Sequence, residues 1–332
     1  TPKPSSAASD VYKRQTVNIA DYEHFHDEYK GMPLDYYVLK SNIEKAKKQF
    51  EEVKPMLQCF EEKFGQYPFY EDGYKLVETP YLGMEHQSAV AYGNKFRKGY
   101  LGTDISCTGV GMSWDYIIVH ESGHEWFGNS ITSKDIADMW IHEGFTTYSE
   151  TVYVECREGY DQAIKYINGQ RYSVQNRKPA IGIFGVNKEG SGDMYFKGAL
   201  MLNTMRHIIN DDAKWWKLIY DYSTTFKKQI IDTETVVDFF NKQSGRNLTP
   251  VFNQYLRYAK IPVLQLKLEG KDLQYRWVTD EPDFTMPIEV AINGKSIRLE
   301  ATNNWQSTTT EAASLSDVQP ADKKFYIKVE KL

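Results

Sequence analysis

The stretch Val119-His120-Glu121-Ser122-Gly123-His124-Glu125 contains the pattern H-E-x-x-H. Two histidines four positions apart lie on one face of a helix, so their imidazole rings can bind one metal ion. Glu121 directly follows the first histidine and can act as a general base on water beside that metal. About 0.01 such matches are expected by chance in a chain of this composition. The pattern therefore favours a metal site over a helix with two structural histidines.

Composition places the chain among ordinary globular proteins. Its 332 residues are 41% hydrophobic and 26% charged, enough for about two domains with a sizeable core. The net charge of −5 gives no reason to expect a nucleic-acid partner. No apolar run approaches the roughly 18 residues that span a bilayer, so we expect no membrane span.

Two features leave the cellular location open. The three cysteines, Cys59, Cys107 and Cys156, show no C-x-x-C spacing and are predicted to be separate buried thiols. The run Asp10–Gln15 resembles the translation of a sequencing adapter, so residues 1–15 are interpreted as a non-native artefact. The natural N-terminus, with any targeting signal, is then expected to be missing.

Hydrophobic periodicity predicts an α+β protein. An amphipathic helix is expected from Ile43 to Phe64, with a restart near Pro55. Short strands follow near 74–79 and 88–92. Helices are then expected around His120, from about Asp135 to Glu158, and near 161–176, 197–220 and 233–258. From residue 262 the apolar residues alternate, and Asn293-Gly294 is a strong hairpin signal. The predicted order is a connector (16–40), a mostly helical catalytic domain with a small sheet at its N-terminal side (41–260), and a small β-sandwich domain (262–332).

A third metal ligand is expected on the next helix. Glu143 follows His124 with eighteen residues between them, which allows one helix to end and the next to return antiparallel. Catalytic zinc sites commonly have three protein ligands and one open position. The neighbouring His142 points about 100° away around the helix, so we assign it to packing or to a contact that supports a ligand.

Four stretches now resemble the gluzincin aminopeptidases, the family of aminopeptidase N and leukotriene hydrolase. The first two are H-E-x-x-H with its downstream flank, and Trp140–Phe145 around Glu143. The third, Gly83-Met84-Glu85-His86, resembles the family's G-x-M-E-N motif, but is one residue shorter and ends in histidine. The fourth, Tyr195–Ala199, resembles its Y-x-K-G segment. The resemblance covers roughly residues 36–332 and implies a thermolysin-like catalytic domain, here of a bacterial member that lacks its N-terminal β-domain.

The resemblance also implies a set of roles. His120, His124 and Glu143 would hold one Zn²⁺ per chain, and Glu121 would be the general base in metal-activated attack of water on a peptide bond. Tyr195 would stabilise the oxyanion.

Substrate recognition is implied by the same resemblance. Glu85 would pair with the free α-ammonium group, so that only the first residue of a peptide is removed. Gly83, Met84 and His86 would also contact the substrate, although the family's asparagine is replaced by His86. The expected partners are peptides with a free N-terminus.

Two alternatives remain open from the sequence. One is a scaffold of the same fold with weak or no catalysis, because we expect the family's N-terminal domain to be missing. The other is a thermolysin-like endoprotease, which shares H-E-x-x-H and a downstream glutamate. The Gly83-Met84-Glu85 segment and the eighteen-residue spacing favour the aminopeptidase.

Overall fold

The computed structural model describes residues 16–332, so the interpretation of residues 1–15 lies outside the described part. The chain divides into two compact units. The first unit comprises the described residues up to Asp135, Ile141–Gln170 and Ile219–Asp232. The second comprises Ile136–Trp140, Arg171–Leu218 and Thr233–Leu332.

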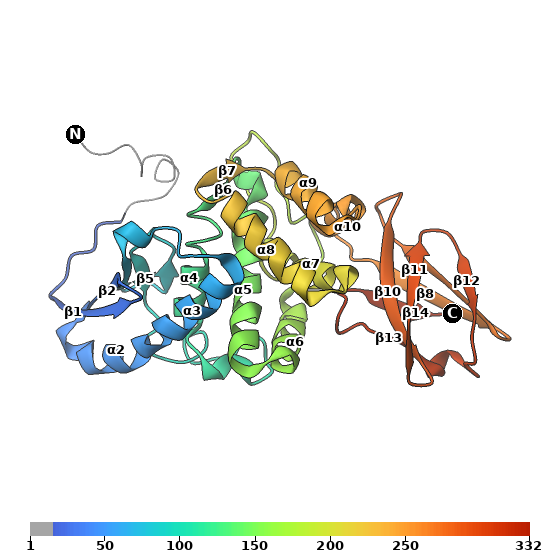
Figure 1. The fold of residues 1–332 in the computed structure, drawn as a ribbon, viewed down its shortest axis with the longest axis horizontal. Helices are drawn as coiled ribbons and strands as arrows, with labels where there is room; N and C mark the ends of the chain where they lie inside the picture. The colour runs from blue at the N-terminus through green and yellow to red at the C-terminus, as the bar shows by residue number, and fades with distance from the viewer. Residues whose placement is uncertain (1–15) are drawn as a thin grey trace. The chain divides into compact units, whose positions relative to one another are not determined.

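The first unit contains a five-stranded mixed sheet of order β1-β2-β3-β5-β4 (Figure 1). Its strands are β1 (Tyr22–Tyr29), β2 (Met32–Leu39), β3 (Tyr74–Glu78), β4 (Gly83–Met84) and β5 (Val90–Tyr92). The β1–β2 hairpin turns at Lys30 and Gly31, which both have positive φ, as a two-residue type I′ turn requires. Strands β2, β3 and β5 run parallel to one another, whereas β4 is antiparallel to β5.

The segment 16–40, predicted to be a connector, instead supplies strands β1 and β2 of this sheet. Every second residue of β2 is buried, the period of a strand with one face on a core: Met32, Leu34, Tyr36 and Val38. Strand β1 is largely exposed and polar. The sequence analysis missed the hairpin because this exposed partner strand carries little hydrophobic signal.

Five helices complete most of the first unit. They are α2 (Ile43–Gln49), α3 (Val53–Phe64), α4 (Tyr116–Gly123), α5 (Trp140–Glu158) and α6 (Tyr160–Gly169). A single 3-10 turn, Phe50–Glu52, separates α2 from α3. Pro55 lies in the first turn of α3, where a missing N–H breaks no helical hydrogen bond. The predicted helix with a restart near Pro55 is confirmed.

The core of this unit is built around Trp126. Its ring packs edge-to-face against Phe60, with ring centroids 5.6 Å apart, and against Tyr67, also at 5.6 Å. Its indole N–H donates to the carbonyl of Gly65 at 2.9 Å, so the buried polar atom is satisfied. Since Trp126 follows His124 by two residues, this aromatic cluster fixes the end of the H-E-x-x-H segment against α3.

The prediction of separate cysteine thiols is wrong for two of the three cysteines. Cys59 on α3 and Cys156 on α5 form a disulfide across a sequence separation of 97. Cys107 is a free thiol as predicted, but it is exposed and not buried. Sequence spacing could not reveal the pair, because the two residues meet only when α3 packs beside α5.

The second unit combines helices with two antiparallel-rich sheets. Its helices are α7 (Asp193–Ile209), α9 (Thr233–Ser244) and α10 (Thr249–Leu256), while α8 (Asp212–Thr225) has residues in both units.

In the first unit, the short strands β6 (Ile131–Ser133) and β7 (Gln229–Ile231) pair in parallel. None of the helices within residues 16–332 has both the length and the apolar character that crossing a membrane requires.

The C-terminal strands form the predicted β-sandwich (Figure 1). One sheet has the order β11-β10-β13 and the other β12-β9-β8-β14. The strands are β8 (Val263–Glu269), β9 (Asp272–Val278), β10 (Thr285–Ile292), β11 (Lys295–Thr302), β12 (Gln306–Thr309), β13 (Val318–Pro320) and β14 (Lys328–Lys331). The indole N–H of Trp277 in β9 donates to the carbonyl of Met286 in β10 and so links the two sheets. Asn293 and Gly294 form the predicted β10–β11 turn with positive φ, and the α+β class is confirmed.

Removing the disulfide should destabilise the first unit. Joining residues far apart in sequence restricts the unfolded chain, which stabilises a fold by about 2–4 kcal/mol. We expect the double variant C59A/C156A to unfold at a lower denaturant concentration than the wild type, followed by tryptophan fluorescence. Cys107→Ala is the matched control and should unfold like the wild type. A wild-type unfolding midpoint that does not move when reductant is added would contradict the prediction.

Candidate metal centre and active site

Helix α4, which carries the first histidine, is held at its start by Asp115. The Asp115 carboxylate caps the helix by accepting from the backbone N–H of Ile117 at 3.0 Å. It also accepts from Gln49 Nε2 at 2.6 Å and from the Tyr92 hydroxyl at 2.7 Å. Burial raises the pKa of Asp115, and these donors oppose that rise. The cap therefore ties the helix start to α2 and to strand β5.

The two histidines converge as the sequence predicted. Helix α4 ends at Gly123, but His124 keeps right-handed helical φ and ψ, so it stays on the face of His120. Their ring centroids lie 5.1 Å apart. A β-carbon at Gly123 would lie 2.5 Å from Ser149 Oγ on α5, which is closer than real contacts allow. Glycine at this position therefore lets α4 approach α5 without displacing the Ser149 side chain.

Glu143 on α5 completes a buried three-residue group. Its Oε2 atom lies 3.3 Å from His124 Nε2 and 3.7 Å from His120 Nε2. One ligand atom from each residue lies within 4.8 Å of the other two. Among residues 16–332, Glu143 Oε2 has no hydrogen-bond partner although it is buried. Two imidazole nitrogens and a carboxylate oxygen are a donor set that fits a catalytic zinc ion.

Glu143, His120 and His124 shift one another's pKa values because their side chains lie close together. Burial raises the pKa of Glu143, but His124 and His120 outweigh it and hold this pKa well below its usual range. Burial lowers the pKa of His120, but Glu143 and Glu150 outweigh it and raise this pKa. The pKa of His124 is raised in the same way, burial being outweighed by Glu143 and Glu85. Negative charge at this site therefore favours a cation.

A carboxylate that the sequence analysis missed orients His120. Glu150 Oε1 lies 2.7 Å from His120 Nδ1, so the ring presents Nε2 to Glu143. The other oxygen of Glu150 accepts from the Tyr166 hydroxyl at 2.7 Å and from Gln170 Nε2 at 3.0 Å. Glu150 follows Glu143 by seven positions, which is two helical turns on one face of α5. That spacing was the signal that could have identified it.

His124 is oriented by the backbone instead. Its Nδ1 atom lies 3.0 Å from the carbonyl oxygen of Phe127, which also accepts from the Thr146 hydroxyl at 3.2 Å. His142 lies outside the three-residue group: its Nε2 accepts from the backbone N–H of Ser133 at 2.8 Å. That contact agrees with the packing role expected for His142.

Glu121 lies next to Glu85 in the same unit. One ligand atom each from Glu85, Glu121 and His124 lie within 4.8 Å of one another. Glu121 is buried, and burial raises its pKa to about 7, while His120 and His124 oppose the rise and Glu85 adds to it. A carboxyl group with such a pKa can both accept and release a proton near neutral pH.

The strand before Glu85 needs glycine for a close approach to Glu121. A β-carbon at Gly83 would lie 2.7 Å from Glu121 Oε1 and 3.0 Å from Ile117 Cγ2. Met84 follows in β4 and pairs with Ala91 of β5. Gly83 therefore brings this edge of the sheet directly against the carboxylate of Glu121.

Beyond β4 the chain turns back. The backbone N–H of His86 donates to the carbonyl of Met84 at 2.9 Å, and Asn129 Nδ2 donates to the carbonyl of Glu85 at 2.9 Å. His86 is partly exposed, like Glu85. Of the nine predicted site residues, six lie close together at the distances given above: Gly83, Glu85, His120, Glu121, His124 and Glu143. Met84 and His86 adjoin them in sequence.

Tyr195 belongs to the second unit, where it lies partly exposed in the first turn of α7. Two residues later, the buried Nζ of Lys197 donates to the carbonyls of Tyr258 and Ala259, at 2.9 and 2.8 Å. Burial lowers the pKa of Lys197 to about 8. Lys197 therefore fixes the start of α7 against the segment after α10, a role the sequence did not reveal.

A buried His-His-Glu group next to two further carboxylates is the arrangement of side chains typical of a metallopeptidase site. Residues 48–255 match the Peptidase family M1 domain, and the chain belongs to this family. It is 21% identical over 304 residues to probable aminopeptidase 1 of Sulfurisphaera tokodaii, covering 84% of this chain and 38% of that protein. It is 25% identical over 210 residues to mouse aminopeptidase B, covering 53% and 32%.

A third relative is aminopeptidase N of Lactobacillus helveticus, which is 29% identical over 175 residues. That match covers 46% of this chain and 21% of the relative. The chain spans about a third of the length of the curated relatives it matches first. Their names therefore enter below as support for a proposal.

Replacing Glu150 by glutamine should weaken metal binding. The variant keeps the side-chain size but removes the negative charge beside His120 Nδ1, and such changes typically cost 10–100-fold in metal affinity. We expect a drop of about that size in zinc affinity, measured by competition with a chromophoric chelator. Glu158→Gln, an exposed change on the same helix, is the control. Wild-type affinity in E150Q would show that the contact does not orient the ligand.

Proposed function

We propose that this chain is a zinc-dependent aminopeptidase that removes single residues from peptides with a free N-terminus. The observation that carries the proposal is the position of Glu85 beside Glu121 and His124, next to the His120-His124-Glu143 group. The aminopeptidase names of the relatives support the same reaction.

The metal would be held by His120, His124 and Glu143. When bound there, Zn²⁺ would supply Lewis-acid chemistry, polarising the scissile carbonyl and activating water for attack on it. His120 and His124 present Nε2 because their Nδ1 atoms face Glu150 and the Phe127 carbonyl.

Proton transfer would fall to Glu121. Its buried carboxylate would take a proton from the attacking water and pass it to the nitrogen of the departing amine. The pKa of about 7 suits both steps, because the group is neither too weak a base nor too weak an acid near neutral pH. Gly83 supports this role by allowing β4 to lie directly against the Glu121 carboxylate.

Charge recognition would be divided between Glu85 and Tyr195. The Glu85 carboxylate would bind the substrate's α-ammonium group, which also relieves its repulsion with Glu121. That contact limits how far a peptide enters, so the first peptide bond is the one cleaved. The Tyr195 hydroxyl would donate a hydrogen bond to the oxyanion, a contact that strengthens as negative charge develops.

Cleavage of a free-amine substrate should depend on Glu85. We expect the wild type to cleave leucine 4-nitroanilide and to leave the N-acetylated analogue essentially uncut. Glu85→Ala removes one partner of a partly buried charge pair, which typically costs 2–5 kcal/mol, so kcat/KM should fall by about 30-fold or more. Glu71→Ala, an exposed acid on the same unit, is the control.

Three outcomes would separate the alternatives. Equal cleavage of the free and acetylated anilides by the wild type would contradict the aminopeptidase. Internal cuts in a casein digest would favour a thermolysin-like endoprotease. A zinc-loaded chain that cleaves neither would favour a non-catalytic scaffold of the same fold.

A further inference from the structure

The segment that carries Glu85 connects β4 to β5 and has no regular secondary structure of its own. The backbone N–H of His86 donates to the carbonyl of Met84 at 2.9 Å, and that of Ala89 donates to the carbonyl of His86 at 3.0 Å. Ser88 has a φ of 56°, in the left-handed region that a serine adopts only at a cost in free energy. Such a conformation persists only where surrounding contacts hold it in place.

Glu125, which directly follows His124, supplies the first of these contacts. Its Oε1 atom accepts from the backbone N–H of Ser88 at 2.8 Å. Both residues are buried, and Glu125 has none of its surface exposed. Water cannot compete for this bond, so Glu125 holds the Ser88 backbone in its left-handed conformation.

Asn129 supplies the second contact, and this one reaches Glu85 itself. Its Nδ2 atom donates to the backbone carbonyl of Glu85 at 2.9 Å, and only 1% of the residue is exposed. The backbone N–H of Asn129 donates to the carbonyl of His124 at 2.9 Å. Asn129 thus joins the backbone of a proposed metal ligand to the backbone of Glu85.

The stretch that carries Glu125 and Asn129 is fixed by its own backbone. The N–H groups of Asn129, Ser130 and Ile131 each donate to the carbonyl five residues earlier, at 2.9, 3.1 and 3.1 Å. Successive hydrogen bonds of this kind form a wide, π-type turn. The two side chains therefore have set positions relative to His124.

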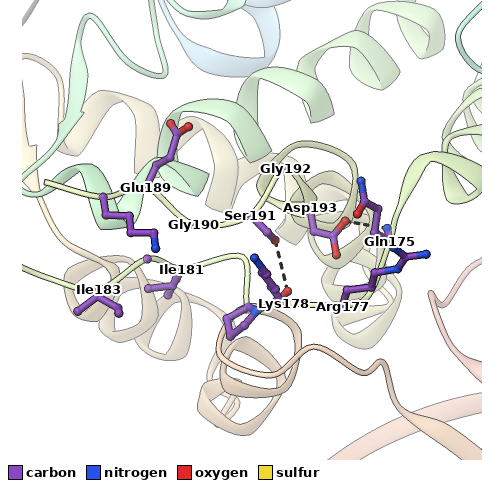
Figure 2. A pocket seen from close by; sticks show the side chains of 13 residues that line it. Gln175, Arg177, Lys178, Ile181, Ile183, Glu189, Gly190, Ser191, Gly192 and Asp193 are labelled. Atoms are coloured by element: carbon purple, nitrogen blue, oxygen red, sulfur yellow. Dashed lines mark hydrogen bonds between the residues drawn. The ribbon is translucent and has the colours of Figure 1, made fainter. Parts of the chain in front are cut away.

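A loop of the second unit is fixed in a different way. Residues 175–193 line a cavity of about 680 Å³ (Figure 2). Contacts within the loop itself close it: Asp193 accepts from the backbone N–H of Gln175, and the Ser191 hydroxyl donates to the carbonyl of Lys178. The segment that carries Glu85 is instead tied to the stretch after His124, so its position follows that of the metal site.

These contacts set the distance between Glu85 and the three proposed ligands. Resting on the proposed function, we propose that Asn129 and Glu125 are positioning residues for the reaction. They hold the Glu85 carboxylate where it binds the substrate's α-ammonium group while the first peptide bond lies at the metal. Neither residue needs to touch the substrate, because both are buried and act through the backbone of Glu85 and Ser88.

Two inhibitors of leucine 4-nitroanilide cleavage separate positioning from a general structural role. 3-Methylbutylamine is protonated at neutral pH and supplies only the ammonium group, whereas acetohydroxamate binds zinc and has no ammonium group. Asn129→Leu removes the donor to Glu85, and Glu125→Leu removes the acceptor for Ser88. In both variants we expect the Ki of the amine to rise about two- to tenfold, the effect of losing one hydrogen bond. The Ki of acetohydroxamate and the zinc content should equal those of the wild type.

Three further variants serve as references. Glu125→Gln keeps an acceptor oxygen for Ser88 and should restore wild-type inhibition by the amine. Thr132→Val is the matched control, because it removes a buried hydrogen bond to the Gly128 carbonyl in the same stretch and leaves the Glu85 segment untouched. Glu85→Ala should lose inhibition by the amine, since it lacks the group that binds ammonium.

The outcomes distinguish this inference from the proposed function. An amine Ki that stays unchanged in both leucine variants, or that rises together with the hydroxamate Ki or with loss of zinc, would overturn the inference while leaving the aminopeptidase intact. An amine Ki in Glu85→Ala equal to that of the wild type would overturn the assignment of Glu85, and this inference with it. A wild type that does not cleave the anilide would have the same consequence.

Discussion

Glu143 Oε2 lies between the Nε2 atoms of His120 and His124 in a buried position where residues 16–332 offer it no hydrogen bond. Leaving a buried carboxylate oxygen without a donor costs free energy unless a cation compensates it. The histidines cannot turn away, because their Nδ1 atoms are committed to Glu150 and to the Phe127 carbonyl. A metal ion is the simplest group that satisfies all three ligands at once.

Much of the first unit serves to keep those three side chains in place. Asp115 fixes where α4 begins, and Gly123 lets α4 approach α5 closely enough for Glu143 to reach the histidines. Gly83 does the same for the sheet edge that carries Glu85. Such glycines stabilise nothing by themselves, yet each sets a distance that a β-carbon would lengthen. The proposed reaction therefore depends on close backbone approaches as much as on the reacting groups.

The three proposed ligands could be predicted from sequence because their geometry is largely local. His120 and His124 are one helical turn apart, and the spacing to Glu143 is long enough for one helix to end and the next to return beside it. The position of Glu150, two helical turns after Glu143, could also have been noticed in the sequence. Its role became visible only with its contact to His120. The Cys59–Cys156 disulfide depends on which distant segments pack together, and the exposed strand β1 left too weak a pattern. Local periodicity carries no information on those features.

The most direct test of the metal site is the zinc content of the purified chain, determined by mass spectrometry after dialysis against metal-free buffer. The account predicts about one zinc per wild-type chain and less than about a tenth of that in Glu143→Gln, since removing one of three ligands lowers affinity steeply. Glu158→Gln, on the same helix, should retain the wild-type content. A wild-type chain without zinc, or a Glu143→Gln chain with a full equivalent, would contradict the claim that His120, His124 and Glu143 form the metal centre.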